Sequence, residues 1–277
     1  MWYDTAMTSH ENVPGVYVPV TGIDYPENPD QPILFPKKVR TVVLDENYPY
    51  LDKSFLARLR HFLVYLGIFV LVFPVQKIRY GLKIEGRENI RKNKALFRNG
   101  VLTVCNHVYR WDFLACLQAV RWRRMWFPAR PDNLESSDAG LIRAAGGIPI
   151  PEGFGASRRF NEAFDQLHAR KKWIHVFPES CHWDFYQPIR PFKKGAFTMA
   201  IRYQIPVLPL VISYREATGF QKLIGTKHLI TIHIGEPLVP PPELSRKEAT
   251  VWLRDEAHKQ MCSMAGIKKN CWPASGD

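Results

Sequence analysis

A histidine and an aspartate five residues apart, His107 and Asp112, occur in the stretch VCNHVYRWDF. An imidazole titrates near neutral pH, so it can take the proton from a hydroxyl group that attacks a carbonyl carbon. A carboxylate bonded to that imidazole would fix its tautomer and stabilise the cation that forms. The two residue types therefore predict a general base, His107, and its orienting acid, Asp112.

The spacing of this pair restricts where it can lie. Five residues along a regular helix correspond to a rotation of about 140°, so both side chains on one helix would point apart. They can meet only if His107 precedes the helix, and the pattern provides such a turn: residues 101–106 read as a strand and residues 111–122 as a helix. Ligands bind at this end of strands in α/β sheets. A structural contact at the start of the helix remains an alternative.

The elements that would hold this turn alternate between short apolar runs and helical patterns from residue 82 onward. Such alternation predicts an α/β fold with a mixed, largely parallel sheet flanked by helices. Ser157 is a candidate N-cap for the helix that follows it, and Ser245 with Glu248 forms a candidate capping box. The expected strands are Leu82–Glu85, Val101–Cys105, Trp126–Phe127, Gly147–Ile150, Trp173–Phe177, Val207–Ser213 and Leu229–Ile234.

Two segments precede this α/β domain, which we place at residues 81–277. Residues 1–50 contain seven prolines and predict an extended arm. Residues 51–80 predict a membrane-associated helical segment, since Phe62–Val75 contains no charge and has cationic flanks. That apolar core spans about 21 Å as a helix, short of the roughly 30 Å of a bilayer core. We expect it to lie in one leaflet; a buried core helix is the alternative.

The charge balance and the cysteines narrow the class of protein. Lys and Arg number 38 against 26 Asp and Glu, and the net charge of +12 attracts anionic membranes, phosphorylated substrates or nucleic acid. The five cysteines show no paired spacing, which favours free thiols in a reducing compartment. A cysteine nucleophile at Cys105 or Cys181 is a weaker alternative, because buried thiols are usually inert. We expect no metal site.

Five blocks occur in a fixed order along the chain: NHVYRWD, GGIPIP, VFPES, PFKKGAF and VLPLVIS. Together they resemble the glycerolipid acyltransferase family, typified by 1-acylglycerol-3-phosphate acyltransferases, over roughly residues 82–235. The resemblance implies that His107, with Asp112, removes the proton from a lysophospholipid hydroxyl. The acyl donor would be acyl-CoA or acyl carrier protein, and no cofactor is implied.

The resemblance also implies a substrate-binding set. Glu179 matches the family's acceptor-site glutamate. Lys193, Lys194 and Gly195 match the block that follows it, where the lysines could hold a phosphate. A solvated helix start is the alternative interpretation of these lysines.

Two departures from the family pattern concern the acceptor. The family usually has FPEGTR where this chain has FPESCH, so that Ser180 replaces glycine and His182 replaces arginine. A second arginine, common shortly after the GGIPIP block, is also missing. We therefore expect either that the acceptor is not plain lysophosphatidate, or that Arg158, Arg159 and the lysines supply the positive charge.

The prediction is an O-acyltransferase on the cytoplasmic face of a membrane, monotopic or peripheral. Its partners would be membrane lipids, a lysophospholipid acceptor and the acyl thioester, and not nucleic acid. Three alternatives stay open: a non-phosphatidate acceptor such as an aminolipid, a basic membrane-binding or nucleic-acid-binding protein without catalysis, and an inactive relative of the family.

Overall fold

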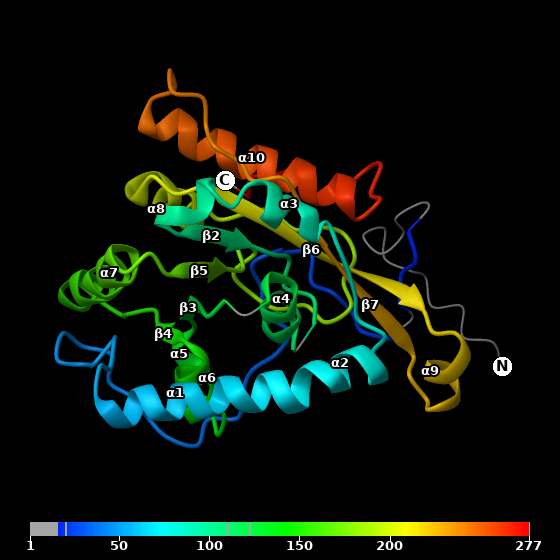
Figure 1. Cartoon of the computed structure of the whole chain (residues 1–277), viewed down its shortest axis with the longest axis horizontal. Coiled ribbons are helices and arrows are strands. Elements are labelled where there is room, and N and C mark those ends of the chain that lie inside the picture. Colours follow the sequence, from blue (N-terminus) through cyan, green and yellow to red (C-terminus); the bar gives the residue numbers. More distant parts are fainter. Residues whose placement is uncertain (1–15, 20, 110, 122, 277) are drawn as a thin grey trace.

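The structure is a computed structural model that describes residues 16–19, 21–109, 111–121 and 123–276. A seven-stranded sheet with the order β1-β7-β6-β2-β5-β3-β4 forms its centre (Figure 1). Strands β6 and β7 are antiparallel and all other neighbours are parallel, so the expected mixed, largely parallel sheet is confirmed. The strands are β1 Lys83–Glu85, β2 Val101–Val104, β3 Met125–Ala129, β4 Gly147–Pro149, β5 Trp173–Val176, β6 Val207–Glu216 and β7 His228–Ile234.

Helices cover both faces of this sheet. Alternate residues of β2 point to opposite sides: Leu102 and Val104 join the core beneath α7, α8 and α10, whereas Val101 joins the core beneath α3, α4 and the N-terminal helix. The helices are α1 Phe55–Gly67, α2 Phe73–Arg79, α3 Arg87–Lys92, α4 Asp112–Val120, α5 Pro131–Glu135, α6 Ala139–Ala145, α7 Phe154–Ala169, α8 Gly195–Tyr203, α9 Gly219–Leu223 and α10 Arg246–Met264.

One of the two expected helix starts is confirmed. Ser245 and Glu248 form a full capping box at the start of α10. Ser157 is not an N-cap: α7 begins one turn earlier, after Gly153, and the Ser157 hydroxyl donates to the Gly153 carbonyl at 2.8 Å. The earlier start is consistent with packing, because Ala156 in the first turn is buried in the core.

The N-terminal helix is longer than its uncharged core suggested. Helices α1 and α2 are joined by a π-helical turn at Ile68–Val72, so that one apolar helix runs 25 residues from Phe55 to Arg79. One side packs on the domain, where the Tyr65 hydroxyl contacts the carbonyls of Met125 and Ala145 at 3.2 and 3.1 Å. Apolar side chains on the other side are exposed, among them Phe55, Leu56, Phe62, Leu63, Val70, Leu71 and Ile78.

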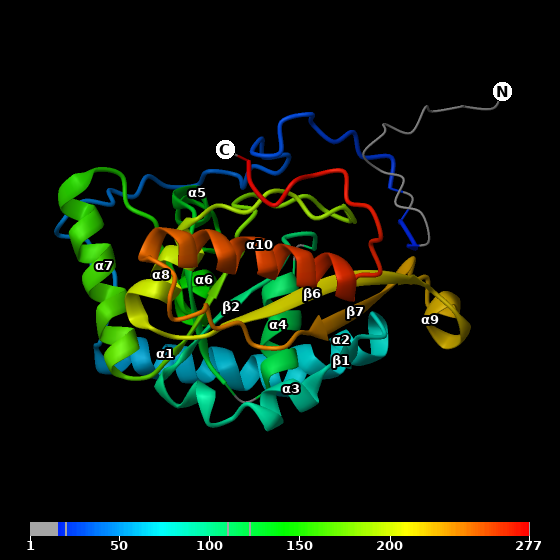
Figure 2. The ribbon, with the colours of Figure 1, turned by 90° about the horizontal axis from the view of Figure 1, so that it is seen from above.

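The proline-rich arm contains neither helix nor strand in its described residues. Figure 2 shows it, in blue, running along the side of the molecule opposite α1 and α2. Tyr25 and Ile33 of the arm pack against a small cluster formed by Cys181, Trp183 and Tyr186. The arm therefore covers the loop that follows β5.

Candidate active site

The pairing of β2 with β5 places two of the sequence blocks side by side. The two strands are parallel neighbours, with Val104 opposite Val176, so their carboxyl ends lie at the same edge of the sheet. His107 follows β2 and Phe177 follows β5. Their rings stack with centroids 4.0 Å apart and an interplanar angle of 11°.

His107 and Asp112 are in direct contact. Nδ1 of His107 lies 2.6 Å from Oδ2 of Asp112, which is the first residue of α4. His107 precedes the helix, as the five-residue spacing requires. The other carboxylate oxygen, Oδ1, accepts the backbone N–H of Phe113 at 2.7 Å, so Asp112 both orients the histidine and stabilises the start of its helix.

The remaining nitrogen of His107 is available for chemistry. Its Nε2 makes no hydrogen bond to any described residue, and the His107 side chain is 25% exposed while that of Asp112 is 2% exposed. Burial raises the pKa of Asp112 to about 8 and lowers the pKa of His107 well below its usual value. Both shifts favour uncharged groups. Because the two side chains share one short hydrogen bond, they titrate as a unit.

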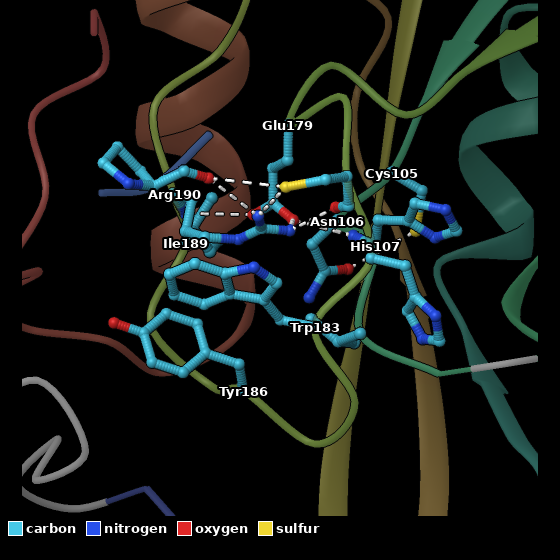
Figure 3. Close-up of polar contacts among 12 residues, drawn as sticks. Cys105, Asn106, His107, Glu179, Trp183, Tyr186, Ile189 and Arg190 are labelled. Atoms are coloured by element: carbon cyan, nitrogen blue, oxygen red, sulfur yellow. Dashed lines mark hydrogen bonds and ion pairs between the residues drawn. The ribbon is translucent and has the colours of Figure 1, made fainter. Parts of the chain in front are cut away.

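Glu179 lies behind the histidine rather than in the open part of the site. Its Oε2 accepts the backbone N–H of His107 at 2.9 Å and Nη2 of Arg190 at 2.9 Å, and its Oε1 accepts the Arg190 backbone N–H at 2.9 Å (Figure 3). The side chains of Glu179 and Arg190 are both 0% exposed. The carboxylate expected to bind the acceptor is thus fully occupied by the chain itself.

Arg190 is a site residue that the sequence analysis did not single out. In addition to Glu179, its guanidinium donates to the carbonyls of Cys181 and Pro29 and lies 4.4 Å above the Trp183 ring. An arginine inside the otherwise uncharged run FYQPIRPF was the available signal, because a cation in such a run needs a buried anion.

Asn106 was also missed. Its side-chain amide accepts the backbone N–H of Ile212 at 2.8 Å and donates to the Ile212 carbonyl at 3.0 Å. Through these two hydrogen bonds, the Asn106 side chain continues the pairing of β2 with β6 beyond Val104. It fixes the backbone immediately before His107.

Ser180 and His182 occupy the positions where the family pattern has glycine and arginine. Ser180 is exposed and has φ of +64°, the left-handed region that favours glycine. The His182 ring lies 4.7 Å from the His107 ring, and its Nε2 lies 3.1 Å from a carboxylate oxygen of Asp184. His182 therefore borders the His107 imidazole.

The remaining candidate residues are not gathered around the pair. Nζ of Lys193 contacts a carboxylate oxygen of Asp30, on the arm, at 2.6 Å. Lys194 and Gly195 are exposed at the start of α8. Arg158 and Arg159 both pair with Glu162 on the exposed side of α7. That helix follows β4, which lies three strands from β2, or about 14 Å away.

The site also contains donor atoms suited to a cation. One ligand atom from each of His107, Asp112 and His182 lies within 4.8 Å of the others. The 2.6 Å contact between His107 and Asp112 uses Nδ1 and Oδ2, so an ion bound to those two atoms would replace this hydrogen bond. A thiol nucleophile finds little support, because burial raises the pKa of Cys105 well above its usual value.

Comparisons with known proteins agree with the block pattern. The family model described as acyltransferase matches residues 81–213. The human 1-acyl-sn-glycerol-3-phosphate acyltransferase beta is 26% identical over 200 residues, which make up 71% of this chain and 68% of the human protein. The crystal structure of the 1-acyl-sn-glycerophosphate acyltransferase PlsC from Thermotoga maritima is similar in fold, with a TM-score of 0.50, 20% identity, and coverage of 79% of this chain and 98% of that one.

Proposed function

We propose that this chain, as a member of the glycerolipid acyltransferase family and an O-acyltransferase of the 1-acylglycerol-3-phosphate acyltransferase type, moves a fatty acyl group from an acyl thioester to a hydroxyl of a lysophospholipid. His107 acts as the base in this proposal. The observation that carries this mechanism is the 2.6 Å contact between His107 Nδ1 and Asp112 Oδ2. It leaves Nε2, which makes no hydrogen bond to a described residue, as the nitrogen that can take a proton from the acceptor.

The proposed reaction uses these atoms as follows. Nε2 of His107 takes the proton of the lysolipid hydroxyl while the hydroxyl oxygen forms a bond to the thioester carbonyl carbon. Asp112 accepts Nδ1–H and stabilises the imidazolium. The carbon–sulfur bond then breaks, and the thiolate leaves with its electron pair. Since a thiol has a pKa of roughly 8.5, the thiolate departs without an acid catalyst.

Glu179 and Arg190 act in this proposal as positioning residues. Glu179 holds the backbone N–H of His107, and Arg190 neutralises the buried carboxylate. Neither side chain is exposed, which supports a role in fixing the turn rather than in binding the acceptor.

Membrane association would bring the site to its lipid substrate. The helix Phe55–Arg79 is long and apolar enough to cross a membrane by length and composition, although 17% of its most apolar window is buried in the domain. Because one side of this helix packs along the domain and the other presents apolar side chains, we favour a helix lying in the surface of one leaflet. The cytoplasmic face remains our expectation.

Thiol release tests the proposed reaction directly. Purified protein with an acyl thioester and a panel of lysolipids should release thiol only when an acceptor with a free hydroxyl is present. His107→Ala should lower the rate by roughly 10²–10⁴-fold, with the melting temperature as the control for folding. Undiminished turnover in a folded His107→Ala protein would rule out the assignment of the base.

A further inference from the structure

A cavity of about 250 Å³ adjoins the turn that carries His107. Tyr109, Phe185 and Tyr214 line it. The Tyr214 hydroxyl and the Phe185 backbone N–H donate to the carbonyl of Val108 at 2.6 and 2.7 Å. Two residues of the cavity wall therefore hold the residue next to His107, so the cavity wall and the turn that carries the base are tied together.

Two cations line this cavity, and no Asp or Glu among the described residues does. Arg79 is the last residue of α2, and Lys227 lies between α9 and β7. Nη1 of Arg79 donates to the Ile224 carbonyl and to Oγ1 of Thr226, while its Nε and Nη2 donate to no described residue. Lys227 is exposed, and its ammonium contacts no described side chain or carbonyl. Unpaired donors of this kind suit a phosphate.

The cations first expected to bind the acceptor phosphate are occupied elsewhere. Lys193 pairs with Asp30, and Arg158 and Arg159 pair with Glu162. His182, in the place of an arginine, lies against Asp184. The cavity differs from these positions, because Arg79 and Lys227 line it together and none of its described lining residues is an acid.

We propose that Arg79 and Lys227 bind the phosphate of the lysolipid acceptor in this cavity, in place of the two arginines missing from the sequence blocks. This inference rests on the proposed acyl transfer. The volume is smaller than the roughly 300–1,000 Å³ of sites that enclose a drug-sized ligand, so the cavity suits a head group rather than an acyl chain.

The acceptor is favoured over the other phosphate-bearing substrate, coenzyme A, by the position of Arg79. This residue ends the exposed apolar helix. A lysolipid in the leaflet that receives the apolar side of this helix would have its phosphate at the membrane surface, at the level of Arg79. The cavity walls formed by Tyr80 and Ile230 would contact the glycerol and the first carbons of the chain.

Steady-state kinetics of Lys227→Gln test the proposal. Lys227 suits the test because its loss removes no contact within the described chain. The acceptors are 1-oleoyl lysophosphatidate and 1-oleoylglycerol, which lacks the phosphate, and the donor is oleoyl-CoA. The variant should raise KM for lysophosphatidate about tenfold, equivalent to about 1.4 kcal/mol. It should leave kcat, KM for 1-oleoylglycerol and KM for the donor unchanged.

Lys222→Gln is the matched control. This lysine lies in α9, on the same connection between β6 and β7, but it does not line the cavity. Lys222→Gln removes one positive charge, as Lys227→Gln does, and should change neither kcat nor any KM. It therefore controls for a general attraction of the protein to anionic micelles. An unchanged KM for lysophosphatidate in Lys227→Gln overturns the phosphate site. A raised KM for oleoyl-CoA instead assigns the cavity to the donor and also overturns it.

Binding measurements separate this inference from the proposed reaction. Wild-type protein and Lys227→Gln are titrated with 1-oleoyl lysophosphatidate in detergent micelles, without donor. Weaker binding by Lys227→Gln supports the phosphate site even if the wild-type protein acylates no lysolipid. Absence of acylation would contradict the proposed reaction but not the phosphate site. Equal binding by the two proteins overturns the site even if acylation is rapid.

Discussion

Oε2 of Glu179 accepts both the backbone N–H of His107 and Nη2 of Arg190, each at 2.9 Å. One buried oxygen thus joins the turn after β2 to the loop after β5. The position of the His107 imidazole, the proposed base, depends on an ion pair whose side chains are fully shielded from water. Breaking such a pair by removing one charge is far more costly than breaking an exposed one.

Glu179→Gln should therefore destabilise the protein strongly. The substitution keeps the shape of the side chain but leaves the Arg190 cation buried without its anion. We expect the free energy of unfolding to fall by roughly 3–5 kcal/mol, measured by urea denaturation. Glu162→Gln removes the partner of exposed Arg158 and Arg159 and should change it by less than about 1 kcal/mol. Similar small losses in both variants would contradict the role of the buried pair.

The pH dependence of turnover should follow the His107–Asp112 unit. While Asp112 is protonated, its carboxyl donates to Nδ1, so the neutral ring carries its proton on Nε2 and cannot act as a base. Burial raises the pKa of Asp112 to about 8. As the pH rises through this value the carboxylate accepts Nδ1–H, Nε2 becomes free, and kcat/KM should rise and then level off.

Asp112→Asn tests whether deprotonation of Asp112 causes the rise of kcat/KM with pH. The variant loses the titrating carboxyl, and the histidine that remains has a lowered pKa. The rise in kcat/KM should move below pH 6.5, and the rate at the plateau should fall by roughly 10²–10⁴-fold. Asp132→Asn, at a half-buried acid on α5 that pairs with Arg130, should retain the wild-type profile. A wild-type profile that is flat between pH 6 and pH 9 would contradict the shared titration.

Ser180→Gly should stabilise the protein. Ser180 has φ of +64°, a conformation that costs a residue with a Cβ atom roughly 1–2 kcal/mol. Glycine relieves this strain but gains entropy in the unfolded chain, so we expect a net increase in the free energy of unfolding of about 0.5–1 kcal/mol. Ser137→Gly, at an exposed position with negative φ, should be neutral or destabilising. Thermal unfolding of both variants measures the difference, and a lower melting temperature for Ser180→Gly would refute the strain.

Local patterns predicted the fold well where burial follows the sequence. All seven expected strands are present, and β6 differs mainly by continuing to Glu216. The pair of His107 and Asp112 could also be predicted from the sequence, because a strand-to-helix turn is a local feature. The helix Phe55–Arg79 is longer than its uncharged core Phe62–Val75. Basic residues on its exposed side do not interrupt the helix, because its other side is packed against the domain.

Contacts between segments far apart in the sequence could not be predicted in the same way. Lys193 was expected to bind phosphate, yet its partner Asp30 lies 163 residues away. The burial of Glu179 depends on Arg190, which reaches it only because the loop after β5 turns back on itself. Arg79 and Lys227 line the same cavity for a similar reason, since the connection between β6 and β7 is tied to the end of α2.

The proline-rich arm has a practical consequence for anyone shortening this protein. The indole nitrogen of Trp183 donates to the carbonyl of Gln31 at 2.8 Å, and Nη1 of Arg190 donates to that of Pro29 at 3.0 Å. Both donors belong to side chains enclosed by protein. A recombinant fragment that starts near residue 51 would leave both donors without their acceptors. Its kinetics would therefore describe a protein in which the loop that supports His107 is less firmly held.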